Sequence, residues 1–281
     1  MESLVASEWS CVFNHCTRCH KTRRGQGVTK SDKKPFSLWD IPLALVLLTR
    51  LPLPRLPDAV FTRQAQAAWA FPLAGLAVGL LACGVGWIGL AADLSPWICA
   101  GLVLATMTFA TGAMHEDGLA DTADGFWGGF TPERRLEIMK DSHIGTYGVL
   151  ALVLSQLLRF SAIAALIAGG AFWILPAAAI WSRALMPVMM AALPNARGAG
   201  LSHRVGAPPA SACMAGLALA LALILVVAGT SVMIPALFAT LAAAVLAAIA
   251  KAKIGGQTGD ILGATQQAAE IGFLLALSAQ V

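Results

Sequence analysis

Long apolar stretches separated by short polar connections dominate the chain from residue 67 to its end. A helix needs about 20 consecutive apolar residues to cross the hydrocarbon core of a bilayer. Strands of a membrane barrel are shorter and alternate between apolar and polar residues, so only helical spans fit this pattern. The pattern predicts an all-α, polytopic membrane bundle of about six or seven transmembrane helices. The expected spans lie near 67–92, 96–114, 145–168, 171–193, 210–229, 231–250 and, shorter, 262–278.

An earlier apolar segment, residues 41–48, is too short to cross a bilayer. Arg50, Pro52, Pro54 and Pro57 interrupt the apolar pattern directly after it. We therefore expect this segment to be interfacial or re-entrant rather than spanning.

The composition agrees with a membrane protein, because 58% of the residues are hydrophobic and only 12% are charged. A soluble domain carries roughly 25% charged residues. The net charge of +4 arises in the first 38 residues, which hold seven basic and three acidic residues, whereas twelve of each follow from Trp39 onward. A basic excess confined to one tail does not argue for binding of nucleic acid.

The tail divides the chain into two expected regions: a basic, disordered extension at 1–37 and a membrane-embedded domain at 38–281. The extension lacks the apolar core of a signal peptide. Its Cys16, Cys19 and His20 match a haem-attachment pattern, and with Cys11 they also offer zinc ligands at a weak spacing. We favour an extension without either group. The remaining cysteines lie in apolar spans and act as small hydrophobic residues.

A cluster of carboxylates lies within residues 111–148, between two apolar spans. Asp117, Asp121 and Asp124 are four and three residues apart, so on a helix they share one face. Like charges in this arrangement repel unless a cation compensates them, and hard oxygen ligands select Mg²⁺ or Mn²⁺. Mg²⁺ is usually held by a few carboxylates together with substrate phosphates. The stretch predicts a Mg²⁺ site for a phosphorylated substrate; the alternative is a solvated acidic face.

Four further residues adjoin these aspartates in the sequence. Glu116 and Asp141 carry carboxylates that could complete a metal site or contact substrate, and we count Glu116 with the catalytic group. His115 and His143 are ambiguous, because only their position supports a role. We include His143 among the expected substrate contacts.

A second polar island lies at residues 251–260, after the sixth expected span. Gly255, Gly256 and Thr258 could form a backbone nest for phosphate, and Asp260 could add a metal ligand. A turn that caps the last helix explains the same residues equally well.

Arg159 and Arg183 fall inside expected spans. Charges at membrane depth are costly and usually face a cavity or a partner. We expect contacts with substrate phosphate or with an aspartate, and an arginine that reaches back to the interface is the alternative. Gln266 and Glu270, four residues apart on the last span, are similar candidates.

Lysine and arginine are distributed unevenly among the connections. Those near 93–96, 168–171 and 229–231 contain neither residue, whereas the alternate connections contain two or three. By the positive-inside rule the alternate connections face the cytoplasm, and the acidic stretch faces the cytoplasm with them. The residues concerned are Arg55, Arg63, Arg134, Arg135, Lys140, Arg197, Arg204, Lys251 and Lys253.

Three motifs resemble the cobalamin synthase family, the adenosylcobinamide-GDP ribazoletransferases. They are His-Glu-Asp-Gly-Leu-Ala-Asp-Thr-Ala-Asp-Gly at 115–125, Arg-Leu-Glu-Ile-Met-Lys-Asp-Ser-His-Ile-Gly-Thr-Tyr-Gly at 135–148 and Gly-Gly-Gln-Thr-Gly-Asp-Ile-Leu-Gly-Ala at 255–264. The resemblance covers residues 38–281 and departs from the family pattern at His143, where Arg is usual.

The resemblance implies a Mg²⁺-dependent enzyme of the last steps of cobalamin synthesis, in a bacterial inner membrane with its active site toward the cytoplasm. A ribose hydroxyl of α-ribazole, or of its 5′-phosphate, would attack a phosphoryl group of adenosylcobinamide-GDP and release GMP. On this hypothesis Asp117, Asp121 and Asp124 hold Mg²⁺, Glu116, Asp141 or Asp260 completes its ligands, and Asp124 is a candidate base. Expected partners are these small molecules and membrane lipids, with a homo-oligomer possible.

Three other activities compete with this prediction. A CDP-alcohol phosphotransferase also uses spaced aspartates, but its DGxxAR run is not met, because Leu-Ala-Asp-Thr follows Asp117-Gly118. A membrane prenyltransferase needs two aspartate-rich clusters, and the second island offers only Asp260. A transporter could use Arg159, Arg183 and Glu270 for ion coupling, but would not need a cytoplasmic carboxylate cluster.

Overall fold

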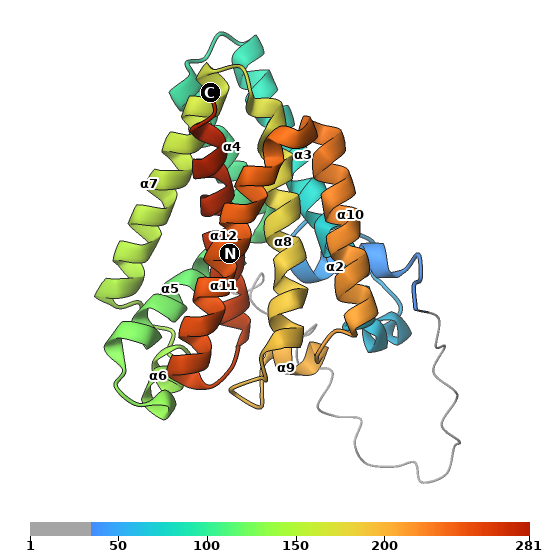
Figure 1. Cartoon of the computed structure of the whole chain (residues 1–281), viewed down its shortest axis with the longest axis vertical. Helices are drawn as coiled ribbons and strands as arrows, with labels where there is room; N and C mark the ends of the chain where they lie inside the picture. Colours follow the sequence, from blue (N-terminus) through green and yellow to red (C-terminus); the bar gives the residue numbers. More distant parts are fainter. Residues whose placement is uncertain (1–34) are drawn as a thin grey trace, which may run out of the picture. The chain divides into compact units, whose positions relative to one another are not determined.

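The computed structural model describes residues 35–281, which are helical and contain no strand apart from one isolated bridge between Asn195 and Gln257 (Figure 1). All but the last three residues of the expected extension, including its Cys/His pattern, lie outside the described residues. The eleven α-helices of the described part are α2 (Asp40–Leu48), α3 (Phe71–Ala91), α4 (Pro96–Thr111), α5 (Met114–Gly128), α6 (Pro132–Ile138), α7 (Thr146–Ala168), α8 (Leu175–Ala192), α9 (Leu201–Val205), α10 (Ala210–Ala228), α11 (Met233–Ile254) and α12 (Gly259–Ser278). Short 3-10 helices occur at η1 (Asp58–Arg63), η2 (Gln66–Ala70), η3 (Phe172–Ile174) and η4 (Gly229–Val232).

Within residues 35–281, four helical tracts are long and apolar enough to cross a membrane: Gln66–Ala91, Thr146–Ala168, Phe172–Ala192 and Ala210–Ile254. A fifth arises if α4 and α5, which meet at a bend of 86°, form one broken span. The last tract contains both α10 and α11, for which two spans were expected. The last expected span, 262–278, lies within α12, which is not among these tracts.

The outer surfaces of α7 and α11 are apolar, as contact with lipid requires. Soluble proteins rarely expose large contiguous apolar patches. Together with the apolar tracts, these surfaces indicate a membrane protein. The exposed side chains include Leu150, Leu154 and Leu157 of α7 and Leu237, Phe238, Leu241 and Val245 of α11.

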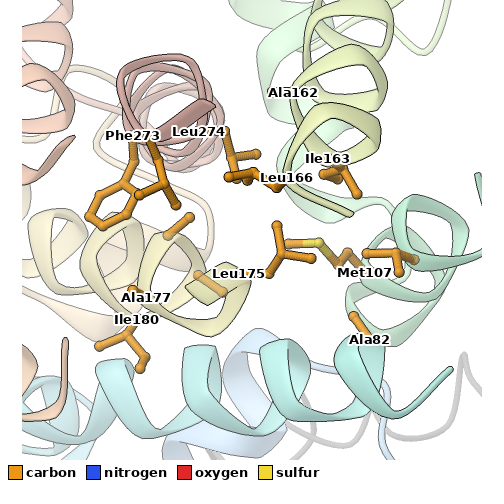
Figure 2. Close-up of a cluster of buried hydrophobic side chains, with 14 of the residues drawn as sticks. Ala82, Met107, Ala162, Ile163, Leu166, Leu175, Ala177, Ile180, Phe273 and Leu274 are labelled. Atoms are coloured by element: carbon orange, nitrogen blue, oxygen red, sulfur yellow. The ribbon is translucent and has the colours of Figure 1, made fainter. Parts of the chain in front are cut away.

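Two helices, α8 and α12, form the centre of the bundle. α8 packs against α3, α10, α11 and α12, and α12 also contacts α5 and α7. Figure 2 shows the main hydrophobic core, where Phe273 and Leu274 of α12 lie near Leu166 of α7 and Leu175 of α8. Met107 of α4 extends the same core toward α3. The polar residues of α12 are therefore enclosed by protein rather than by lipid.

The short segment at 41–48 forms most of α2, which has nine residues. α2 begins at Asp40, whose buried carboxylate accepts hydrogen bonds from Arg63 Nε at 3.0 Å and from Trp69 Nε1 at 2.9 Å. These bonds fix α2 against the chain that leads into α3. Its length agrees with the expectation of a segment that does not span the membrane.

Candidate active site

The acidic stretch forms α5, a helix as expected, and its direction is set by a bend after α4. Gly112 and Ala113 both have a left-handed backbone, with φ of +64° and +56°. A left-handed residue ends a helix, and two in succession turn the chain through the 86° bend. α5 therefore leaves the line of α4 and lies with α6 in the lower left of Figure 1.

Close packing between α5 and α12 brings two polar segments together. A Cβ atom on Gly118 would lie 2.7 Å from the Asp260 backbone oxygen and 3.2 Å from Gly263 Cα. A Cβ atom on Gly263 would lie 3.2 Å from the backbone of His115. Only residues without a side chain allow the helix backbones this approach. The first and third sequence motifs are thus adjacent in space.

We call Asp117, Asp121 and Asp260 the acidic cluster. Asp117 is exposed, whereas Asp121 and Asp260 are partly buried. The charges of Asp117 and Asp260 act on Asp121, and Arg197 is the opposing cation. Burial raises the pKa of Asp260, and Asp117 adds to this effect, although Arg197 and Thr258 act in the other direction. Carboxylates whose charges act on one another in this way are stabilised by a bound cation.

Arg197 reaches the acidic cluster from the connection after α8. Its Nη2 donates to Asp260 Oδ2 at 2.9 Å. The bridge between Asn195 and Gln257 holds the two connections together, with Gln257 N donating to Pro194 O at 2.8 Å and Ala196 N donating to Gln257 O at 2.9 Å. The sequence had indicated Arg197 only as a cytoplasmic charge. The only other indication in the sequence was that its connection and the one that carries Asp260 were expected on the same side of the membrane.

Within residues 35–281, no three Asp, Glu, His or Cys side chains come together closely enough to form a metal site by themselves. Mg²⁺ commonly binds one or two carboxylates and completes its octahedron with water and substrate phosphates. Asp117, Asp121 and Asp260 supply ligands of that chemistry. These residues fit Mg²⁺ bound together with a diphosphate.

Asp124 shares the helix face of Asp117 and Asp121 but is engaged elsewhere. Its Oδ2 accepts from Gly145 N at 2.7 Å and its Oδ1 accepts from Gly148 N at 2.9 Å. These amides belong to the first turn of α7, where backbone N–H groups lack partners within the helix. The carboxylate is buried and caps α7. Its expected role as metal ligand or base stays a prediction.

A groove of about 270 Å³ opens between the end of α5, α6 and the start of α7. Asp124, Asp141, His143, Ile144 and Tyr147 are among its lining residues. His143 Nδ1 lies 2.7 Å from Asp141 Oδ1, and this hydrogen bond lowers the pKa of Asp141 and raises that of His143. The two expected substrate contacts thus form an exposed pair beside the groove.

Glu116 points into the bundle, away from solvent. Arg159 Nη1 donates to Glu116 Oε1 at 2.8 Å and to Gln267 Oε1 at 3.1 Å, while its Nη2 donates to Glu270 Oε1 at 2.7 Å. All four side chains are buried. The structure therefore separates Glu116 from the acidic cluster, although the two are adjacent in sequence.

Arg183 completes this arrangement, which we call the buried network: Glu116, Arg159, Arg183 and Glu270. Arg183 Nη1 lies 3.6 Å from Glu270 Oε2. Gln266 Nε2 donates to the same oxygen at 2.6 Å. Two arginines balance two glutamates, and each arginine side chain is only 2% exposed. Neither arginine reaches the surface, and their carboxylate partners are glutamates instead of the expected aspartate. A contact with substrate phosphate stays a prediction.

The second polar island joins α11 to α12. Gly255 ends α11 in a left-handed conformation with φ of +75°, and Gly256 packs against the Pro194 carbonyl. Thr258 Oγ1 accepts from Ile261 N at 3.4 Å as the cap of α12 and donates to Asp260 Oδ2 at 3.2 Å. These contacts are those of a turn and a cap. A phosphate contact by Gly255, Gly256 or Thr258 stays a prediction.

Comparison with known proteins gives consistent matches. A family model described as cobalamin-5-phosphate synthase matches residues 40–278. A protein of Bradyrhizobium diazoefficiens named adenosylcobinamide-GDP ribazoletransferase is 46% identical over 245 residues, which are 85% of this chain and 93% of the relative. Proteins of the same name from Mesorhizobium japonicum and Rhizobium meliloti are 44% and 42% identical, over 85% and 86% of this chain and 92% and 97% of theirs. No solved structure matches the chain.

Proposed function

The chain belongs to the cobalamin-5-phosphate synthase family, and we propose that the acidic cluster is the centre at which it acts as an adenosylcobinamide-GDP ribazoletransferase. The enzyme transfers the cobinamide phosphoryl group of adenosylcobinamide-GDP to α-ribazole or its 5′-phosphate. The observation that carries the location is the meeting of Asp117 and Asp121 with Asp260 and Arg197. This contact brings the first and third sequence motifs together in space.

The reaction exchanges one phosphorus–oxygen bond for another. A ribose hydroxyl oxygen of the acceptor attacks the phosphorus that carries cobinamide, and the bond from this phosphorus to the bridging oxygen of the diphosphate breaks. GMP leaves with that oxygen, and the hydroxyl proton passes to a carboxylate. Positioning and charge stabilisation carry most of such a transfer.

Each residue of the site has a distinct task in this proposal. One or two of the carboxylates of Asp117, Asp121 and Asp260 would hold Mg²⁺ together with the diphosphate, and the ion would neutralise the charge of the phosphates. Arg197 can leave Asp260 for a phosphoryl oxygen, because guanidinium groups bind both kinds of oxyanion. Asp121 takes the hydroxyl proton in place of Asp124, since both oxygens of Asp124 already accept backbone hydrogen bonds.

We place the protein in the bacterial inner membrane, with six or seven spans and with the acidic cluster toward the cytoplasm. The basic residues of α6 and α9 support this orientation, because both helices lie at the lower end of the bundle in Figure 1. Nucleotides and Mg²⁺ are available on that side. Because the chain belongs to this family, we prefer the ribazoletransferase activity to the phosphotransferase and transporter alternatives.

The test of the function is release of GMP by the purified protein in liposomes. Adenosylcobinamide-GDP, α-ribazole 5′-phosphate and Mg²⁺ are supplied together, and then each is left out in turn. We expect GMP only when all three are present, and none after EDTA removes the metal. Release that persists in EDTA would contradict the metal role, and release without the acceptor would indicate hydrolysis instead of transfer.

Gly118→Ala is expected to lower GMP release by about 100-fold, because the added Cβ would push α5 away from α12 and separate Asp121 from Asp260. Displacements of about 1 Å can cost that much in a positioned reaction. Gly128→Ala is the matched control on the same helix, since its Cβ would make only an ordinary 3.5 Å contact with Ile138. Steady-state rates of GMP release in liposomes, measured for both variants, test this prediction. Equal rates for the two variants would show that the spacing of the helices is unimportant.

A further inference from the structure

A cavity of about 70 Å³ lies beside the start of α5, enclosed by α2, α3, α8, α9 and α12. Its wall is almost entirely apolar and includes Phe71, Met186, Met190 and Leu262. The cavity is separate from the groove that Asp141 and His143 line. Apolar cavities with few polar groups are the usual binding places of flat organic ligands.

The cavity wall contains two polar side chains, and only one of them is engaged. Ser202 Oγ accepts from Asn195 Nδ2 at 2.8 Å. His115 is 1% exposed, and its Nε2 has no hydrogen-bond partner among the described residues. Leaving a buried polar nitrogen unpaired costs free energy. A ligand with one hydrogen-bonding atom and an otherwise apolar surface would remove that cost.

Two helices, α5 and α12, connect the cavity to the acidic cluster. On α5, His115 lies two residues before Asp117 and six before Asp121, about 9 Å along a helix axis. On α12, the lining residue Gly259 directly precedes Asp260. A molecule held in the cavity therefore borders the site proposed for phosphoryl transfer.

We propose that this cavity receives the base of the acceptor nucleoside, a ring system that is apolar except for one unsubstituted nitrogen. This inference rests on the proposed function, which makes α-ribazole, a dimethylbenzimidazole riboside, the acceptor. The imidazole of His115 donates a hydrogen bond from Nε2 to the free nitrogen of the base. The ribose then extends toward Asp121, and the donor diphosphate occupies the opposite side of the acidic cluster, where α5 continues to the groove.

The cavity must enlarge to hold a two-ring base, since an engineered apolar cavity known to bind benzene has a volume of about 150 Å³. Met186 and Met190 can provide this space, because unbranched methionine side chains change rotamer easily. The five-residue helix α9 closes one side and contributes Leu201 to the wall. Binding of the base is thus expected to displace these side chains rather than the long helices.

Equilibrium binding of α-ribazole to the full chain in nanodiscs, without donor, tests the proposal independently of turnover. Met190→Phe fills the cavity, and Met189→Phe is the matched control, because Met189 is equally buried on α8 but does not line the cavity. We expect Met190→Phe to raise the Kd for α-ribazole at least tenfold and Met189→Phe to leave it within twofold. In liposomes, the KM for α-ribazole should rise likewise while the KM for adenosylcobinamide-GDP stays unchanged.

A second measurement tests the proposed hydrogen bond between His115 and the base, and it does not require a larger side chain to fit into the cavity. The unchanged chain should bind α-ribazole about 10- to 100-fold more tightly than the matching indole riboside, which lacks the free ring nitrogen. His115→Phe should lose this preference. Retention of monodisperse protein in size-exclusion chromatography confirms that the variants fold.

The outcomes separate this inference from the function it rests on. Normal α-ribazole binding by Met190→Phe and a persisting preference in His115→Phe would overturn the inference, even if GMP release is normal. Binding that depends on both residues without any GMP release would support the base site and overturn the proposed reaction. Absence of α-ribazole binding to a chain that still releases GMP with it would assign the cavity to another occupant, such as a lipid chain, and overturn the inference.

Discussion

Asp121→Asn is expected to slow GMP release about 10³-fold at saturating substrates and Mg²⁺. The amide keeps the shape of the side chain but removes the charge that, in the proposed mechanism, binds the metal and accepts the hydroxyl proton. Loss of one group that stabilises charge in a transition state costs about 10²–10³ in rate, and here the metal is weakened as well. Steady-state GMP release in liposomes at several Mg²⁺ concentrations measures the effect.

Asp93→Asn is the matched control, because it makes the same change at an exposed aspartate in the connection between α3 and α4. The backbone there has φ of +56°, which asparagine adopts readily. This variant should keep the rate of the unchanged chain. A near-normal rate for Asp121→Asn at saturating Mg²⁺ would exclude Asp121 from both the metal and the proton transfer.

Arg159→Met is expected to lower the free energy of unfolding by about 3–5 kcal/mol, the cost of breaking a buried ion pair from one side. The substitution leaves Glu116 and Glu270 with Arg183 as the only cation of the buried network. Chemical denaturation in detergent, followed by tryptophan fluorescence, measures the loss. Adding Glu116→Gln restores neutrality and should recover part of the stability.

The control for this variant is Arg134→Met on α6. Arg134 Nη1 pairs with Glu137 Oε2 at 3.0 Å, but both side chains are about two-thirds exposed. Exposed ion pairs contribute little, so the change in unfolding free energy should stay below about 1 kcal/mol. Equal effects of the two substitutions would mean that burial does not govern the strength of the Arg159 contacts.

Local patterns in the sequence were sufficient to predict the helices, including the one that carries the aspartates. Apolar stretches gave the positions of α3, α7, α8, α10 and α11 to within a few residues. The spacing of Asp117, Asp121 and Asp124 correctly predicted one helix face. The spacing could not predict that the first turn of α7 lies beside Asp124. Residues on one face of a helix but at different positions along its axis contact different neighbouring elements.

The contacts that the sequence did not reveal join residues far apart in the chain. Arg197 and Asp260 are 63 residues apart, and neither connection indicates its partner. Glu116 is a different case, since adjacent residues on a helix point about 100° apart. Its separation from Asp117 could have been predicted from helical geometry. Its pairing with Arg159, which also contacts Glu270, required knowledge of how α5, α7 and α12 pack.

The buried network also has a consequence for the order in which the chain is made. Glu270 follows Arg159 by 111 residues, which at about 5–20 residues per second takes roughly 6–22 s of translation. Glu116 precedes Arg159 by 43 residues and can serve as its first counter-ion, whereas Arg183 must wait for Glu270. A charge without a partner at membrane depth is costly. We therefore expect the bundle to reach its full stability only when α12 packs against α5 and α7, and because the same helix carries Asp260, stability and a complete acidic cluster arise together.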